Sequence, residues 1–119
     1  MKRVLVVDDD PDIREMLDLA LSAEGYEVVT AADGAAGLDA VREATPDVIL
    51  LDLKMPGMGG EEFADRYRQG AGPRAPVVVV AAAQDTPQRA AAIGAQAYLL
   101  KPFELDELLS LVGRFAGVP

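Results

Sequence analysis

The chain has 119 residues, 50% of them hydrophobic, and its formal net charge is −9 at pH 7. This length suits one domain, residues 1–119, and the acidic balance disfavours direct binding to a nucleic-acid backbone. The sequence contains neither cysteine nor histidine, which excludes disulfides, thiolate metal sites and imidazole catalysis.

The first segment predicts a strand, a helix and a second strand. Residues 4–7 are a continuous run of valine and leucine, as expected of a strand buried on both faces. Asp10 followed by Pro11 is typical of a helix start, with the aspartate as N-cap. Gly25 is expected to end that helix in a left-handed conformation, and residues 27–31 resume an extended pattern.

The middle segment repeats this order. Asp33 is predicted to cap a second helix that Pro46 terminates, and residues 48–51 form a third apolar run. Residues 54–60 have the glycine- and proline-rich composition of a turn. A third helix follows, and its predicted inward-facing residues are Phe63, Ala64 and Tyr67.

The last segment predicts two further strands and two helices. A glycine- and proline-rich loop at 70–76 leads into a buried strand at 77–80. The Thr-Pro pair at 86–87 repeats the helix-start signal and opens a short helix that ends at Gly94. Residues 97–100 read as the fifth strand. The final helix carries an apolar stripe of Leu105, Leu108, Leu109, Val112 and Phe115.

Strands that alternate with helices along the whole chain predict an α/β fold. We expect a doubly wound, five-stranded parallel sheet with helices on both faces. The longest apolar run, residues 77–83, is much shorter than the ~20 residues of a membrane helix, and no signal peptide is visible before the first strand. We therefore expect a cytoplasmic protein without a membrane partner.

Charged residues stand directly after three of the predicted strands. Asp8 and Asp9 follow the first strand, Asp52 follows the third, and Lys101 follows the fifth. The carboxyl ends of parallel strands meet at one edge of the sheet, where ligands bind in such folds. Carboxylates about 4 Å apart repel by about 4 kcal/mol at an effective dielectric of 20, so the cluster must bind a proton or a cation. Among cations, Mg²⁺ suits its oxygen ligands best.

This cluster points to phosphoryl-transfer chemistry. A metal and an ammonium group together stabilise a phosphoryl group, and an aspartate can become an acyl phosphate. Asp52 is the best candidate nucleophile because it stands alone at its strand end. Two nearby residues have a purely structural interpretation: Asp10 as a helix cap and Tyr98 as a half-buried sheet residue.

The chain resembles the receiver domain of two-component response regulators over essentially its whole length. The resemblance rests on VLVVDDD at 4–10, DVILLDLKMPGMGG at 47–60 and AYLLKPF at 97–103, in the order and spacing of that family. It implies a flavodoxin-like sheet with strand order 2-1-3-4-5.

The resemblance implies a role for each residue of the cluster. Asp52 would accept a phosphoryl group from a histidine kinase or a phosphotransfer protein. Asp9, Asp52 and the backbone carbonyl of Lys54 would bind Mg²⁺ directly, and Asp8 would act through a metal-bound water. Lys101 would contact a phosphoryl oxygen.

The resemblance also implies an output face, built from the fourth helix, the fifth strand and the fifth helix, that a downstream protein would read. Tyr98 would move with phosphorylation, and the Lys101–Pro102 peptide bond would be cis. Lys54 and Ala83 match two variable positions that tune dephosphorylation in relatives. The domain would be a monomer or a weak homodimer.

The chain departs from the family pattern at Ala81, where the family usually has Ser or Thr. The missing hydroxyl normally hydrogen-bonds the phosphoryl group, at a cost of roughly 1 kcal/mol when lost, while the backbone of Ala82 remains a candidate contact. Without that hydroxyl Tyr98 loses its usual trigger, so we expect an atypical switch. Gly59 replaces a frequent Asp at the cost of a helix cap. The stretch 81–101 is shorter than usual, which predicts a clipped loop or a short fourth helix.

Three alternatives remain open at this point. A pseudo-receiver would bind partners without phosphorylation, which Ala81 favours and the intact charged cluster opposes. A phosphatase of the haloacid dehalogenase type would use the D-x-D of residues 8–10, but the chain is short for that class. A flavodoxin-like electron carrier shares the architecture, but acids in the first loop would repel the phosphate of FMN.

Overall fold

The computed structural model describes residues 1–70, 74–82 and 86–119, and strands and helices alternate through them. The strands are β1 (Arg3–Val7), β2 (Glu27–Ala31), β3 (Val48–Leu51), β4 (Val77–Ala81) and β5 (Ala97–Leu100). The helices are α1 (Pro11–Ala23), α2 (Gly34–Glu43), α3 (Gly60–Gln69), α4 (Thr86–Ala92) and α5 (Leu105–Ala116). Ala83, which the sequence singled out, lies outside the described residues.

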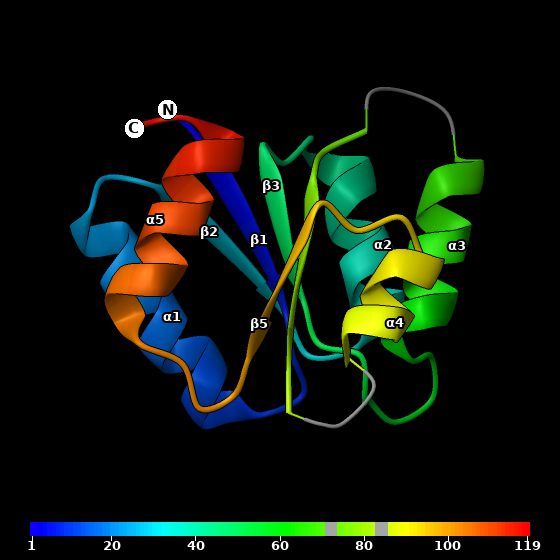
Figure 1. Ribbon diagram of the computed structural model, residues 1–119. Helices are drawn as coiled ribbons and strands as arrows, with labels where there is room; N and C mark the ends of the chain where they lie inside the picture. Colours follow the sequence, from blue (N-terminus) through cyan, green and yellow to red (C-terminus); the bar gives the residue numbers. More distant parts are fainter. Residues whose placement is uncertain (71–73, 83–85) are drawn as a thin grey trace.

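The five strands form one parallel sheet in the order β2-β1-β3-β4-β5. Figure 1 shows α1 and α5 on one face of this sheet and α2, α3 and α4 on the other. The predicted fold class and strand order are therefore confirmed. Because β1 and β3 are direct neighbours, the residues that follow them lie side by side.

Each central strand sends alternate side chains into two separate hydrophobic cores. In β1, Leu5 and Val7 pack into the core under α2 and α3, whereas Val4 and Val6 pack into the core under α1 and α5. Ala81 at the end of β4 belongs to the first of these cores. Burial on both faces explains why the strand sequences are unbroken apolar runs rather than alternating patterns.

The helix ends follow the predicted signals. Asp10 accepts a hydrogen bond from the backbone N–H of Asp12 at 2.9 Å, and Asp33 accepts one from the N–H of Ala36 at 2.8 Å. Gly25 follows α1 with a φ of 100°, a left-handed conformation that glycine adopts without steric cost. Both N-caps and the glycine stop are therefore confirmed.

Small differences from the predictions lie at the ends of elements. β1 already begins at Arg3, which pairs with Glu27 in β2, and β4 continues to Ala81, which pairs with Leu100 in β5. Leu105, the first residue of α5, is 40% exposed, whereas Leu108 and Val112 of the same apolar stripe are buried. α4 has seven residues and is the shortest helix described, which agrees with the prediction of a short fourth helix.

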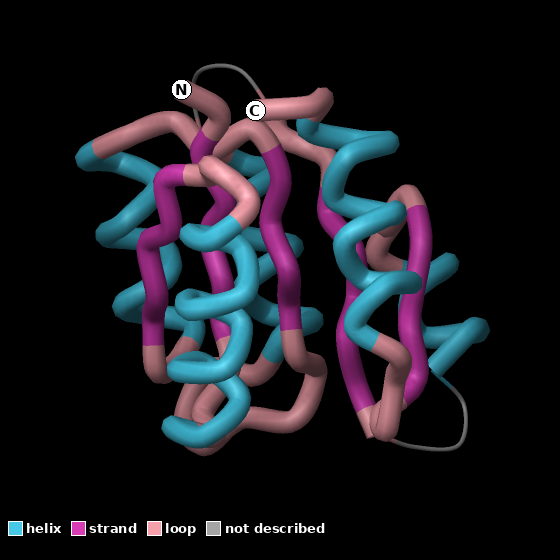
Figure 2. Tube along the Cα trace, turned by 90° about the vertical axis from the view of Figure 1, so that its left-hand side faces the viewer, coloured by secondary structure: helices cyan, strands magenta, loops and turns pink. Residues whose placement is uncertain are grey.

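The carboxyl ends of the strands lie at the edge of the sheet opposite to the chain termini. In both views the N- and C-termini lie together at the upper edge (Figures 1 and 2). The loops that follow β1, β3 and β5 therefore share the lower edge. Within the described ranges, no helix combines the length and the apolar character needed to cross a bilayer.

Candidate functional site

Three carboxylates gather at this lower edge. One oxygen each of Asp8, Asp9 and Asp52 lies within 4.8 Å of the others, among the described residues. Asp8 is 3% exposed and Asp52 7% exposed, whereas Asp9 is exposed to solvent. The proximity that the sequence predicted from the strand ends is therefore confirmed.

Backbone pairing of the strands places these side chains. Val7 and Leu51 are partners in the register of β1 and β3, so the next residues, Asp8 and Asp52, leave the sheet together. The N–H of Asp52 donates to the carbonyl of Val7 at 2.9 Å, and the N–H of Asp8 donates to the carbonyl of Ala31 at 3.1 Å. Both aspartates are thus anchored by the sheet rather than by a free loop.

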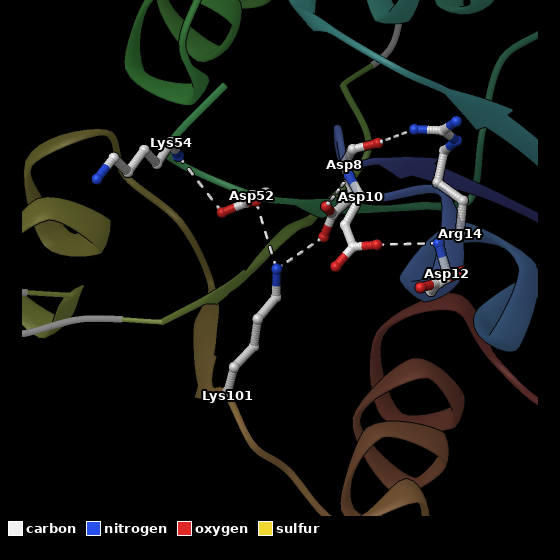
Figure 3. A network of polar contacts seen from close by, with 7 residues as sticks. All are labelled: Asp8, Asp10, Asp12, Arg14, Asp52, Lys54 and Lys101. Atoms are coloured by element: carbon white, nitrogen blue, oxygen red, sulfur yellow. Dashed lines mark hydrogen bonds and ion pairs between the residues drawn. The ribbon is translucent and has the colours of Figure 1, made fainter. Parts of the chain in front are cut away.

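Lys101 enters the cluster from the end of β5. Its Nζ donates to Oδ2 of Asp8 at 2.9 Å and to Oδ2 of Asp52 at 3.3 Å (Figure 3). Its backbone N–H donates to the carbonyl of Ala81 at 3.1 Å, and its side chain is only 19% exposed. The ammonium group therefore compensates two buried carboxylates at once.

Backbone N–H groups hold the outer oxygens of the same two carboxylates. The N–H of Asp10 donates to Oδ1 of Asp8 at 2.9 Å, and the N–H of Lys54 donates to Oδ1 of Asp52 at 3.3 Å. Arg14 on α1 donates from Nη1 to the carbonyl of Asp8 at 2.7 Å, which fixes the turn after β1 (Figure 3). Sequence reasoning missed Arg14; its one signal was a cation in the first turns of a helix, where the helix dipole favours anions.

Burial and the contact between Asp52 and Lys101 have opposite effects on the pKa of each of these two residues. Burial, followed by the charge of Asp8, raises the pKa of Asp52, although Lys101 and the N–H of Lys54 act in the other direction. Burial alone would lower the pKa of Lys101, but its contacts with Asp8 and Asp52 outweigh burial, and the net shift of the Lys101 pKa is upward. Asp52 thus remains short of positive charge, and the hard oxygen donors of the three carboxylates fit a divalent cation such as Mg²⁺.

The remaining predicted site residues lie around the cluster. Ala81 is buried, Ala82 and Lys54 are exposed, and Tyr98 on β5 is 44% exposed. The Lys101–Pro102 peptide bond is cis, as the resemblance implied. Ala81 therefore adjoins the site through its backbone carbonyl and offers it no hydroxyl.

Comparison with known proteins identifies the family. A family model described as the response regulator receiver domain matches residues 4–113 of the chain. The chain belongs to this family. A receiver domain is a signalling module of two-component phosphorelays rather than an enzyme that turns over a free substrate.

The receiver domain is similar to curated and solved relatives. It is 42% identical over 113 residues to the DNA-binding response regulator MtrA of Mycolicibacterium smegmatis, over 93% of this chain and 49% of that protein. The chain therefore spans about half the length of the curated relatives it matches.

Two solved structures extend the comparison. The chemotaxis protein CheY4 of Vibrio cholerae has a TM-score of 0.88 at 37% identity, over 97% of this chain and 98% of that chain. The response regulator TrrA of Thermotoga maritima, solved in complex with Mg²⁺-BeF, has a TM-score of 0.86 at 36% identity, over 97% of this chain and 99% of that chain.

Proposed function

We propose that Asp52 accepts a phosphoryl group from a histidine kinase or a phosphotransfer protein. The observation that carries this proposal is the contact of Asp52 with Lys101 at 3.3 Å inside a cluster of three carboxylates at the strand ends. Asp52 is buried, lacks full charge compensation and lies next to an ammonium group. Such a carboxylate is suited to accept a phosphoryl group that binds together with a divalent cation.

The transfer balances without any further reactant. A carboxylate oxygen of Asp52 attacks the phosphorus of a phosphohistidine, a new O–P bond forms and the P–N bond breaks. The electron pair of the broken bond stays on the imidazole nitrogen. The ammonium group of Lys101, which contacts Oδ2 of Asp52, is placed to donate a hydrogen bond to a phosphoryl oxygen instead. The N–H of Lys54 continues to donate to Oδ1 of Asp52.

The same residues fit a Mg²⁺ site. We propose that Asp9, Asp52 and the backbone carbonyl of Lys54 bind the ion directly, with Asp8 acting through a water molecule. A bound cation supplies charge neutralisation for the acceptor carboxylate and the incoming phosphoryl group. The relative TrrA was solved with Mg²⁺-BeF, which supports this assignment by similarity.

Phosphorylation is proposed to alter a partner-binding face built from α4, β5 and α5. Tyr98 and Leu100 project from the same side of β5, and Leu105 begins α5; they are 44%, 46% and 40% exposed. Exposed apolar side chains on these elements favour a protein partner.

Acceptor chemistry is tested with a small phosphodonor such as acetyl phosphate. In the presence of Mg²⁺, the wild-type chain should gain one acid-labile, base-labile phosphate, seen as a mobility shift on a phosphate-binding gel. Asp52→Asn should abolish the shift. Asp10→Asn is the matched control, because asparagine retains the helix cap and Asp10 stands outside the cluster of carboxylates.

Ala81 supports one second candidate, a pseudo-receiver that binds its partner without phosphorylation. That candidate predicts no Mg²⁺-dependent labelling of Asp52, together with partner binding that Asp52→Asn leaves unchanged. Labelling of the wild-type chain that is lost in Asp52→Asn would exclude it.

A further inference from the structure

We infer that Glu61 is a positioning residue: its ion pair with Arg89 sets the place of α4 relative to the acceptor turn. This inference deepens the proposed function and rests on it, because it concerns how occupancy of Asp52 reaches α4. Three features of the molecule support it: the weak anchoring of α4, the ion pair, and the packing of Gly60.

α4 has little apolar contact with the rest of the domain. Among the helix residues whose side chains are described, 87–92, only Ala90 is buried, and Ile93 adds one more buried side chain directly after the helix. A single methyl group removes little apolar surface from water, so burial within the helix holds α4 only weakly.

The ion pair connects α4 to the first turn of α3. Nη2 of Arg89 donates to Oε1 of Glu61 at 2.9 Å, and Nε of Arg89 donates to Oε2. This two-point contact fixes direction as well as distance, and it holds the pKa of Glu61 below its ordinary value. Glu61 and Arg89 are 28 residues apart in sequence, so the contact joins two separate elements.

Gly60, the residue before Glu61, ties α3 to the acceptor. A Cβ at Gly60 would lie against the carbonyl oxygen of Asp52 and 2.7 Å from Cα of Leu53. The N–H of Gly60 donates to the carbonyl of Leu53 at 3.0 Å. Backbone therefore touches backbone here, and a displacement of the acceptor turn is passed directly to Glu61.

These contacts form a continuous physical connection from Asp52 to α4. It runs through Gly60, Glu61 and Arg89 and does not use residue 81. A chain with Ala81 therefore retains a route by which the acceptor site and α4 influence one another.

The test measures backbone amide exchange of residues 90–92 by NMR in the full chain. Without ligand, Glu61→Gln should speed exchange in α4 about fivefold, the scale of losing a favourable, partly exposed ion pair. Glu62→Gln is the matched control, because it breaks the Glu62–Arg66 pair of 3.0 Å within α3. A double variant, E61R with R89E, should restore most of the protection.

A second measurement adds Mg²⁺ and beryllofluoride as the phosphoryl mimic. In the wild type, the mimic should shift the amides of Lys54 and of α4 together. In Glu61→Gln the Lys54 shift should remain while the α4 shift falls by at least half, a result that a merely stabilising ion pair would not produce.

Unchanged exchange of α4 in Glu61→Gln would overturn the inference, as would an α4 response to the mimic that matches that of the wild type. If the mimic leaves Lys54 of the wild type unshifted, the proposed acceptor function fails instead. The measurement without ligand then still decides whether the ion pair positions α4.

Discussion

Lys101 makes its shorter hydrogen bond with Asp8, at 2.9 Å, and a longer one with the proposed acceptor Asp52, at 3.3 Å. The ammonium group therefore occupies the space between two carboxylates that would also serve a divalent cation. Ammonium and cation compete for the same negative charge, so Lys101 should stabilise the metal-free fold and weaken cation binding.

Replacing Lys101 by methionine should separate these two effects. Without metal, Lys101→Met should lower the free energy of unfolding by about 2–4 kcal/mol, because two buried carboxylates lose their counter-charge. Affinity for Mg²⁺ should rise by about tenfold, because a competing positive charge is gone. Urea unfolding in EDTA and calorimetric titration with Mg²⁺ measure the two quantities.

The matched control is Lys54→Met, which removes an exposed ammonium group two residues after Asp52. It should change the free energy of unfolding by less than about 0.5 kcal/mol. Equal destabilisation by both variants would contradict a specific role for Lys101.

The raised pKa of Asp52 predicts the pH dependence of stability in metal-free protein. The folded state binds the Asp52 proton more tightly than the unfolded state does, whose pKa is near the ordinary value of 3.8. This contribution to stability is fully present below pH 3.8 and is lost as the pH rises through the folded-state pKa. At neutral pH, Asp52 therefore destabilises the metal-free fold.

Asp52→Asn should consequently be more stable than the wild type at pH 7 in EDTA, by about 1–3 kcal/mol. The difference should shrink as the pH falls from the raised folded-state pKa of Asp52 toward the ordinary value of 3.8, and it should reverse in saturating Mg²⁺, which binds the wild type more tightly. Urea unfolding across pH 3 to 8 measures it. A difference that does not vary with pH would contradict the burial argument.

Ala81→Ser should restore a hydroxyl beside the acceptor. We expect about fivefold tighter binding of beryllofluoride, the equivalent of one hydrogen bond of about 1 kcal/mol, and larger shifts of the Tyr98 ring signals. NMR titration with Mg²⁺ present measures both. Ala82→Ser, at an exposed neighbouring position, is the control, and an equal effect of the two substitutions would assign no special place to residue 81.

The turn before α3 predicts opposite effects at adjacent glycines. Gly60→Ala should cost about 1–3 kcal/mol and slow phosphorylation, because its methyl group would press on the backbone of Asp52 and Leu53. Gly59 is the N-cap of α3 and lacks a side-chain cap. A Cβ there would lie 3.3 Å from the carbonyl oxygen of Leu53, a tight contact that the new cap must outweigh, so Gly59→Ser should stabilise the fold by only about 0.3 kcal/mol. Urea unfolding distinguishes the two signs.

The fold could be predicted closely because local signals and global architecture agree. The run of residues 4–7 needs burial on both faces, and the parallel sheet supplies it. Asp10 and Gly25 bound α1 through interactions within a few residues, which a sequence displays directly. The exposure of Leu105 could not be predicted, because a helical stripe does not say which of its members lies at the solvent end.

The site could be predicted only as far as strand topology determines it. Asp8, Asp52 and Lys101 meet because three strands end at one edge. The contact of Arg14 with a backbone carbonyl and the pairing of Glu61 with Arg89 depend on how helices lie across the sheet. Apart from the unusual place of a cation near the start of a helix at Arg14, no pattern in the sequence marks those partners, since each is a single charged residue on a predicted helix.

Of the three carboxylates, Asp9 alone is exposed, while Asp8 and Asp52 are buried. A divalent cation arriving from solution would therefore meet Asp9 first, with its water shell intact. Because Mg²⁺ sheds water reluctantly, contact with the two buried carboxylates would follow as a separate and slower step. Burial of Asp8 and Asp52 would thus govern how long an ion stays bound more than how often one arrives.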